Sequence, residues 1–303
     1  MRGAAIALSL CAALLCAASF LGRYGLAFDM LGNLRGVVVG IAVISAIFAG
    51  VAGMRIGAVL AVAVALIGGV SILTAPVAER PRAGDAPAIR LLTFNTLLTN
   101  QNPALIAAEI ARSGADIVAL QEASPRLSPM LANLEGLYPY QFECFDEPFC
   151  NLALLSKQPW RTVEAHRAPR FQHPFLKAEF GDGTSGFTLV SVRMFRPRLA
   201  SRYAEYYGRL EDFIVPLQGP VVLIGDMNAA PWSATLSGFS GRTGLRPVNR
   251  LTPTFPVWSG AGFAPIDNAL VSADFTGRPV RRGAAAGSDH YPLIIELYPA
   301  PAR

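Results

Sequence analysis

The sequence predicts an α/β domain of two packed β-sheets with helices outside, preceded by an apolar region of about three transmembrane helices. Three observations predict this fold class. The first 80 residues contain three long uncharged apolar runs. The rest of the chain has short apolar, β-branched runs and a few amphipathic helical segments. Many of those short runs follow one another without a helix, which favours a sandwich of sheets over one doubly wound sheet.

Residues 1–80 are predicted to form the transmembrane region. Its apolar runs cover about 3–22, 37–53 and 56–77, each close to the ~20 residues that cross a bilayer. Glycine and other small residues recur in all three runs, as close helix packing in lipid favours. The first run can also be read as a cleaved signal sequence, but the two further runs favour a retained multi-pass anchor.

Two observations disagree about the side of the membrane that the C-terminal domain occupies. With three spans, more arginines border the runs on the side of this domain, so the positive-inside tendency favours the cytoplasm. Cys144 and Cys150, separated by five residues including a proline, fit a disulfide and hence an oxidising compartment. Two unpaired buried thiols are the alternative, and no nearby histidine completes a zinc site. We expect a bacterial-type inner membrane protein with this domain on the periplasmic side.

Residues 81–88 are predicted to be a polar Pro/Gly linker, and residues 89–298 a globular domain. Helices are expected at 103–113 and 202–215. Strands are expected at 89–94, 116–120, 152–155, 178–180, 187–192, 221–224, 266–271 and 293–297. The net charge of +5 suits an anionic substrate or a membrane surface, although arginine-rich composition explains it equally well.

Polar side chains stand at the ends of these predicted strands. The most informative stretch is 221–228, where four apolar residues lead into Gly-Asp-Met-Asn. In an extended chain Asp226 and Asn228 point to the same side, at a sheet rim where α/β folds place ligands. An Asx turn that caps the next segment is the alternative. The other polar residues at strand ends are Asn95, Glu122, Arg193, Asp267, Asp289 and His290.

These residue types supply what phosphodiester hydrolysis requires. It needs oxygen ligands for a hard cation, a carboxylate that activates water, and donors for the charge on a pentacovalent phosphate. Taken singly, Glu122 also fits a surface or capping residue, and His290 a structural histidine. The combination indicates a metal-dependent phosphoesterase.

The chain resembles the endonuclease/exonuclease/phosphatase superfamily over essentially all of residues 89–298. Five segments carry the resemblance in the family's order: Phe94-Asn95-Thr96, Leu120-Gln121-Glu122, Gly225-Asp226-Met227-Asn228, Ile266-Asp267-Asn268 and Gly287-Ser288-Asp289-His290-Tyr291-Pro292. The apolar runs ahead of them look like the family's bacterial membrane-anchored branch. The resemblance implies a four-layered α/β sandwich and a phosphoesterase that depends on Mg²⁺ or Mn²⁺.

The resemblance also implies roles for the site residues. The metal ligands would be Glu122, as the main ligand, with Asn95 and Asp289. Asp226 would orient or deprotonate the attacking water, and Asn228 would hold a phosphoryl oxygen. A separate pair completes the site: His290 would contact the scissile phosphate, and Asp267 would fix the tautomer of that histidine.

Arg193 departs from the family pattern. In many members the strand at 187–192 leads into a histidine followed four residues later by proline, whereas here Arg193 precedes Pro197. Arginine binds phosphate in bidentate fashion but does not transfer a proton at neutral pH. A smaller departure is Asn268, where a ring-bearing residue is common.

The sequence therefore predicts a membrane-anchored, metal-dependent phosphodiesterase that acts on nucleic acid or a phospholipid headgroup. The alternative is a catalytically weakened, membrane-tethered binding or scaffold module. The segment 193–209 interleaves arginines with aromatic residues and fits either a nucleic-acid groove or a helix with a tyrosine core stripe. Membrane lipids are the expected partners of the N-terminal helices, and no protein partner is inferable.

Overall fold

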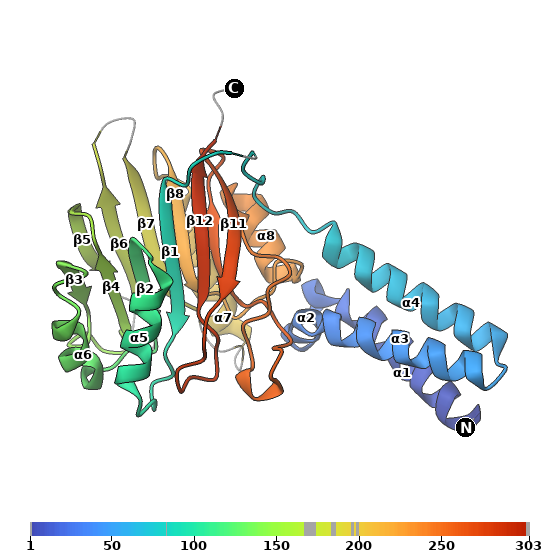
Figure 1. The fold of residues 1–303 in the computed structure, drawn as a ribbon. Helices are drawn as coiled ribbons and strands as arrows, with labels where there is room; N and C mark the ends of the chain where they lie inside the picture. The colour runs from blue at the N-terminus through green and yellow to red at the C-terminus, as the bar shows by residue number, and fades with distance from the viewer. Residues whose placement is uncertain are drawn as a thin grey trace. The chain divides into compact units, whose positions relative to one another are not determined.

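The structure is a computed structural model of the 303-residue chain, and it describes residues 2–82, 84–166, 174–182, 186–194, 197 and 200–300. The chain divides into two units. One comprises Met1–Pro76 with Ala229–Gly238, and the other comprises Val77–Asn228 with Phe239–Arg303. Figure 1 shows the elements of both units.

The larger unit contains two six-stranded mixed sheets. The first has the order β11 (Phe275–Arg282), β12 (Leu293–Pro299), β1 (Ile89–Asn95), β2 (Ile117–Gln121), β4 (Leu152–Ser156), β3 (Tyr140–Glu143). The second has the order β5 (Trp160–His166), β6 (Phe175–Phe180), β7 (Phe187–Arg193), β8 (Val221–Asp226), β10 (Asp267–Val271), β9 (Arg246–Pro247). Each sheet has one parallel pair, β1 with β2 and β7 with β8.

Helices cover the outer faces of these sheets, as predicted for the sandwich (Figure 1). The helices of the larger unit are α5 (Pro103–Ser113), α6 (Ser128–Asn133), α7 (Ala200–Ile214) and the latter half of α8 (Ala234–Thr243), with short 3-10 turns η2 (Pro125–Leu127) and η4 (Val257–Ser259). One apolar cluster, including Leu91, Leu189 and Ile224, draws residues from both sheets. A second includes Ile106 and Ile110 of α5 and packs on the first sheet. The first cluster fills the space between the sheets, and the second joins α5 to the outer face of the first sheet.

Strand register brings the polar strand ends to one edge. In the parallel pair β1–β2, Asn95 lies beside Gln121, and in the parallel pair β7–β8, Arg193 lies beside Asp226. The antiparallel pair β8–β10 places Asp267 opposite Asp226. The carboxyl ends of parallel strands lie at the same edge of a sheet. Polar residues that are far apart in sequence therefore come together there.

Gly225 is required at the end of β8. Its φ is +146°, and a Cβ built there would lie 1.9 Å from the carbonyl oxygen of Val192 on β7. No side chain fits that gap, because β7 and β8 approach each other through their backbones. The glycine before Asp226 therefore serves the sheet as well as the turn that follows.

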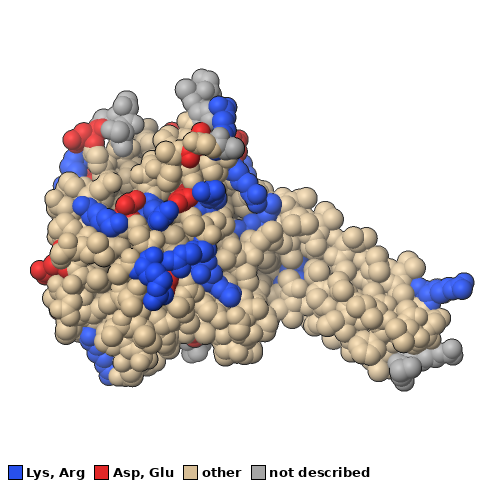
Figure 2. Space-filling view, in the orientation of Figure 1, with Lys and Arg blue, Asp and Glu red and all other residues tan. Residues whose placement is uncertain are grey.

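The face of the first sheet formed by β11 and β12 carries grouped basic side chains (Figure 2). These arginines are paired. Arg90 and Arg278 contact the buried Glu296 at 2.6 and 2.9 Å, and Arg112 and Arg281 contact the buried Glu109. Burial alone would raise the pKa of Glu296, but hydrogen bonds from Arg90, Tyr298 and Arg278 lower it to about 2.

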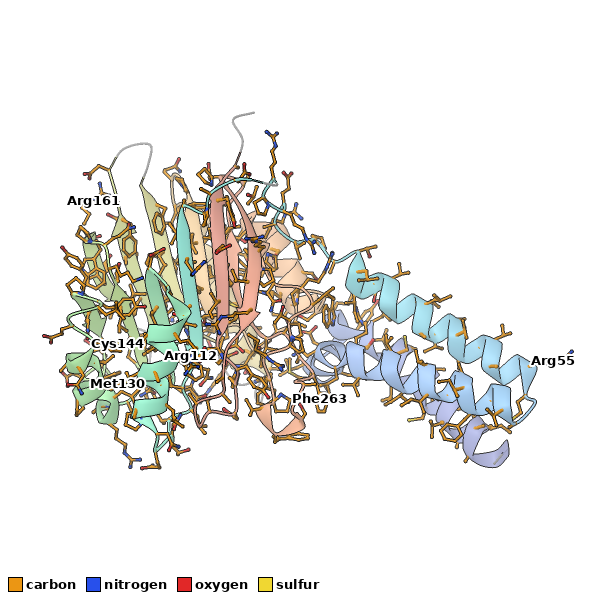
Figure 3. All side chains as sticks on the ribbon, viewed as in Figure 1. Arg55, Arg112, Met130, Cys144, Arg161 and Phe263 are labelled. Atoms are coloured by element: carbon orange, nitrogen blue, oxygen red, sulfur yellow. A yellow bond between two sulfur atoms is a disulfide. The ribbon has the colours of Figure 1, made fainter. Side chains whose placement is uncertain are left out.

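Cys144 and Cys150 form a disulfide in the loop between β3 and β4, with their Cα atoms 5.6 Å apart. Figure 3 draws and labels Cys144. Of the two predicted alternatives, the structure has the bridged one. Cys11 and Cys16 are free thiols.

The smaller unit contains the helices α1 (Arg2–Ser19), α2 (Leu26–Asn33), α3 (Arg35–Val51) and α4 (Arg55–Leu73), with the 3-10 turn η1 (Gly22–Tyr24). Among the described residues, α4 is the one unbroken helix long and apolar enough to cross a membrane. The pair α2–α3, bent by 65°, adds a second candidate if it counts as one span, and the apolar part of α1 is shorter. One or two such helices weakly suggest that the chain associates with a membrane. The presence of three transmembrane helices remains a prediction from the sequence.

The helix α2 was not predicted, and it binds the segment Ala229–Gly238 of the same unit. Asp29, only 2% exposed, accepts a hydrogen bond at 2.6 Å from the backbone N–H of Ala234, the first residue of α8. Asn33 Oδ1 accepts one from the N–H of Ala230 at 2.8 Å, and the Gly32 carbonyl accepts one from Trp232 Nε1 at 2.7 Å. Asp29 thus caps α8 from a distant part of the sequence.

We predict that Asp29→Ala lowers the free energy of unfolding of the full chain by about 1–2 kcal/mol, because the first turn of α8 loses its acceptor. Chemical denaturation in detergent micelles measures this difference. Asp29→Asn keeps an acceptor oxygen and should retain most of the stability. An Asp29→Ala protein as stable as the wild type would contradict the capping role.

Candidate active site

Three buried side chains form the centre of the site. Asp226 at the end of β8, Asp267 at the start of β10 and His290 before β12 each offer a ligand atom, and these atoms lie within 4.8 Å of one another. His290 Nδ1 is 2.9 Å from Asp267 Oδ2. This contact leaves Nε2 as the ring atom free to face a substrate.

Asn95 and Glu122 lie beside this centre. The Asn95 side-chain amide donates to Asp226 Oδ2 at 3.1 Å and to Glu122 Oε1 at 3.3 Å. Glu122 has a φ of +50° and is 4% exposed, and its Oε2 accepts from the N–H of Leu98 at 3.2 Å. A glutamate in this left-handed conformation directly after β2 is uncommon, and such strain is concentrated at functional sites.

Arg193 contacts Glu122. Its Nη2 donates to Glu122 Oε1 at 2.8 Å, and the arginine side chain is 13% exposed. From the sequence we expected Arg193 to stand where many members of the resembled superfamily have a histidine and to be able to bind phosphate; in the structure it pairs with the carboxylate expected to be the main metal ligand. This largely buried guanidinium offsets the charge of the buried Glu122 carboxylate.

Asn228 and Asp226 form the turn that ends β8. Asn228 has a φ of +47°, and its N–H donates to Asp226 Oδ1 at 2.9 Å, which is an Asx turn. The Asn228 amide also donates to Asp226 Oδ2 at 3.1 Å and to the Met194 carbonyl at 3.0 Å. The turn interpretation is therefore correct, and the same turn holds the Asp226 carboxylate in place.

The Ser-Asp-His segment is fixed by its serine. Ser288 Oγ donates to the Asn95 carbonyl at 2.6 Å and accepts from the His290 N–H at 3.0 Å. Within the described residues, Asp289 Oδ1 and Asp267 Oδ1 are buried oxygens without a hydrogen-bond partner. Buried carboxylate oxygens are normally satisfied, so this pair fits a site that receives a cation.

Burial and nearby charges shift the pKa values of Asp226 and His290. Burial raises the pKa of Asp226 to about 6; the nearby His290 opposes this shift and Asp267 adds to it. Burial alone would lower the pKa of His290, but Asp267, Asp226 and Asp289 outweigh it and raise the pKa to about 9. His290 is therefore an imidazolium at neutral pH, surrounded by carboxylates.

Two residues that hold the site in place belong to no motif or periodic pattern in the sequence. Phe255 packs its ring 4.9 Å from the His290 ring, and Thr254 Oγ1 accepts from the Asp267 N–H at 3.3 Å. Both lie in a Pro-containing loop without periodicity. Ser288 belongs to a recognised motif but had no assigned role.

The aromatic residues of α7 belong to the core. Tyr203, Tyr206 and Tyr207 are each 3% exposed or less, and the Tyr207 hydroxyl donates to the Met227 carbonyl at 2.8 Å. Of the two interpretations of segment 193–209, the core stripe is therefore correct for these tyrosines. Several residues of the proposed groove lie outside the described residues: Phe195, Arg196 and Arg198.

The chain belongs to the Endonuclease/Exonuclease/phosphatase family, whose model matches residues 92–290. The resemblance drawn from the five motifs is confirmed, and the family makes the chain a phosphate-ester hydrolase. The family is generally dependent on divalent metals. A comparison with curated proteins gave no match.

Solved structures share the fold. Sphingomyelinase C from Streptomyces griseocarneus is 19% identical, with a TM-score of 0.52 over 70% of this chain and 99% of its own. A functionally unknown protein from Enterococcus faecalis V583 is 16% identical, with a TM-score of 0.55 over 70% and 100%. A family protein from Leptotrichia buccalis is 13% identical, with a TM-score of 0.56 over 69% and 99%. At these identities the likeness shows the fold alone.

We predict that His290 titrates near pH 9 in EDTA, well above the usual 6.5. The stability that it contributes is complete below pH 6.5 and is lost as the pH rises through 9. NMR of the full chain carrying ¹³C-labelled histidine measures the pKa directly, because the sequence has only three histidines. Asp267→Asn should lower this pKa by at least one unit. A His290 pKa of 6.5 or below would contradict the account of the charges.

Proposed function

We propose that the chain is a membrane-anchored, divalent-metal-dependent phosphodiesterase. The observation that carries the proposal is the convergence of Asp226, Asp267 and His290 within 4.8 Å, next to Asn95 and Glu122. All five side chains are buried, Asn95, Glu122 and Asp226 at the ends of strands and Asp267 and His290 at or before the start of one. Burying several ionisable groups together costs free energy, which a binding module without a cation has no physical reason to bear.

The residues fit a hard cation. Glu122, Asn95 and Asp289 would hold Mg²⁺ or Mn²⁺, since carboxylate and amide oxygens are the ligands these ions prefer. Asp289 Oδ1, a buried oxygen without a hydrogen-bond partner among the described residues, supports this fit. When bound, the ion supplies a Lewis acid that offsets negative charge on the phosphate.

The other site residues would act on water and phosphate. Asp226, held by Asn95 and by the Asn228 turn, would orient the attacking water and accept its proton, and its pKa of about 6 suits that task. His290 would place a positive Nε2–H against the phosphate, while Asp267 fixes the ring at Nδ1. As an imidazolium at neutral pH, His290 would also be able to protonate the leaving group, in place of the histidine that is missing at position 193.

Arg193 supports the alternative function. Its contact with Glu122 takes up an oxygen that a metal would need, so a weakened binding module of the same fold is the competing proposal. The arginine can equally serve catalysis. With a metal held at Glu122, the Arg193 guanidinium would be available to bind a phosphate oxygen.

The substrate class we propose is a phospholipid headgroup. Two observations support it over nucleic acid. The tyrosines of α7 are buried and offer no stacking platform for bases, and the grouped arginines over β11 and β12 are paired with buried glutamates. The α4 helix supports proximity to lipid. The Cys144–Cys150 disulfide supports a periplasmic location in an inner membrane.

The test uses the full chain in detergent micelles with bis-p-nitrophenyl phosphate, and with Mg²⁺, Mn²⁺ or EDTA. We predict hydrolysis that requires the metal, and a loss of about 10²–10⁴-fold in kcat for His290→Ala. His166→Ala is the matched control, because His166 contacts Phe175 and Phe213 instead of the site. Turnover that persists in EDTA, or in His290→Ala, would refute the mechanism.

Two further measurements separate the alternatives. A folded protein that binds Mn²⁺ without turning over, and that gains activity as Arg193→His, would establish the weakened binding module. Assays of an active protein on phospholipid vesicles, single-stranded DNA and RNA identify the substrate. Cleavage of nucleic acid alone would replace the lipid assignment.

A further inference from the structure

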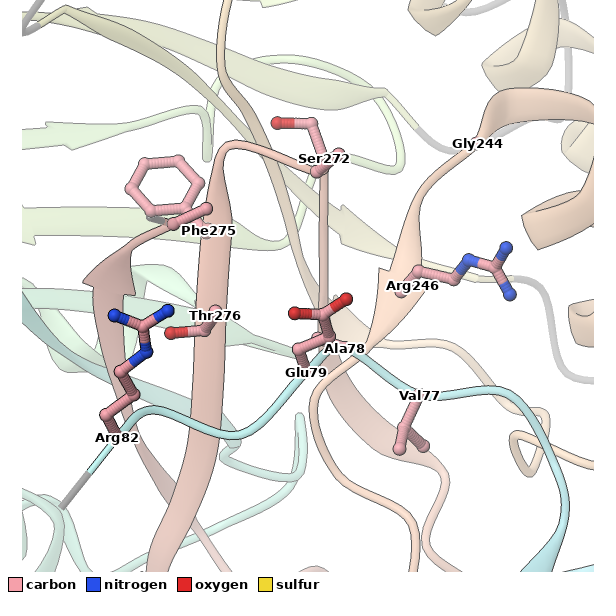
Figure 4. Close-up of a pocket in the computed structure, with 11 residues that line it drawn as sticks. Val77, Ala78, Glu79, Arg82, Gly244, Arg246, Ser272, Phe275 and Thr276 are labelled. Atoms are coloured by element: carbon pink, nitrogen blue, oxygen red, sulfur yellow. The ribbon is translucent and has the colours of Figure 1, made fainter. Parts of the chain in front are cut away.

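The larger unit contains a cavity of about 510 Å³, formed by the segment that follows α4 and by the neighbouring strand ends. Figure 4 shows its lining, which includes the polar residues Glu79, Arg82, Arg246, Ser272 and Thr276 and the aromatic ring of Phe275. No residue of the candidate active site lines it.

The segment after α4 is a fixed wall of this cavity. The N–H of Ala78 donates to the Pro247 carbonyl on β9 at 2.9 Å, and the Glu79 carbonyl accepts from the N–H of Gly277 on β11 at 3.0 Å. These bonds attach the segment to both sheets. The cavity is therefore part of the domain and not a gap under a loose linker.

The chemistry of the lining suits a phosphate group. Arg82 and Arg246 contribute two guanidinium groups, which match phosphate oxygens in geometry and charge, and Glu79 contributes one carboxylate. Two positive charges and one negative charge favour a singly charged or zwitterionic ligand over a highly charged polyphosphate.

Thr276 provides an independent indication of a ligand. It is 4% exposed, and its hydroxyl is buried without a hydrogen-bond partner in the described part of the chain. Figure 4 shows this hydroxyl on the side of the Arg82 guanidinium. A buried hydroxyl is normally satisfied, so one that lines a cavity beside a cation indicates a missing acceptor.

The cavity lies at the end of the first sheet opposite to the candidate active site. Phe275 at its edge pairs with Pro299, the last residue of β12, whereas His290 precedes Leu293, the first residue of that strand. Seven residues of strand, at about 3.4 Å per residue, separate the two ends by roughly 20 Å. The two sites are therefore independent in space.

Only a few residues of chain separate this cavity from a candidate membrane span. Helix α4 ends at Leu73, and Val77, which lines the cavity, is four residues further on. Four residues reach at most about 14 Å. If α4 crosses a membrane, lipid headgroups are within reach of this cavity.

We propose that this cavity binds a phosphate group, with Arg82 and Arg246 neutralising it and the Thr276 hydroxyl donating to one of its oxygens. A phospholipid headgroup and a small soluble phosphate share this chemistry. The site makes no use of the residues of the candidate active site and does not rest on the proposed phosphodiesterase activity.

The test is calorimetric titration of the full chain in micelles with dihexanoyl phosphatidylglycerol and, separately, with inorganic phosphate. It is done in EDTA and on the His290→Ala background, so that the candidate active site contributes little. We expect Arg82→Gln and Arg246→Gln each to weaken binding tenfold or more, and Thr276→Val about fivefold. Arg161→Gln, an exposed arginine on β5 paired with Glu179, is the matched control and should bind as the parent does.

The two probes distinguish a lipid headgroup from a soluble phosphate as the natural ligand. Binding of the lipid alone assigns the site to a headgroup, and binding of inorganic phosphate with equal affinity assigns it to a soluble ligand. Thr276→Val keeps shape and volume and should remain folded, as a thermal melt confirms. No binding of either probe, or an equal loss in Arg161→Gln and the cavity variants, would overturn the proposal.

Discussion

The interaction on which the site depends is the buried contact of His290 with Asp267, 2.9 Å long, beside Asp226. Two carboxylates this close repel each other strongly away from water, and the imidazolium between them offsets that repulsion. The carboxylates raise the pKa of His290, whereas burial, with a smaller contribution from Asp267, raises the pKa of Asp226 against the effect of the histidine. The surrounding fold serves to hold these groups together: β8 and β10 supply opposed aspartates, and Ser288 fixes the loop that carries the histidine.

Much of this arrangement was predictable from the sequence. Periodicity gave α5 with the observed bounds, and apolar runs ending in Asn95, Glu122 and Asp226 gave the strands whose ends meet. Buried strands can be recognised in a sequence because the residues on both of their faces are apolar. The edge strand β11, Phe275–Arg282, was missed because its exposed face is basic and its sequence contains glycine and proline.

Other features depend on tertiary contacts that no local pattern encodes. The pairing of Arg193 with Glu122 joins residues 71 positions apart, and the cap that Asp29 provides for α8 joins residues 205 apart. An aspartate in an apolar stretch shows only that a partner must exist, because an unpaired buried carboxylate is too costly. The cavity that includes Thr276 likewise appears only when two strand ends and the segment after α4 are assembled.

The central claim is that the strand ends form a cation site, and direct metal binding tests it best. Mn²⁺ titration of the full chain, followed by the electron paramagnetic resonance signal of the free ion, counts bound metal without reference to turnover. The account predicts saturable binding that Glu122→Gln and Asp289→Asn each weaken at least tenfold, with Glu164→Gln, an exposed glutamate on β5, as control. Mn²⁺ binding that is absent, or that these site variants leave unchanged, would contradict it.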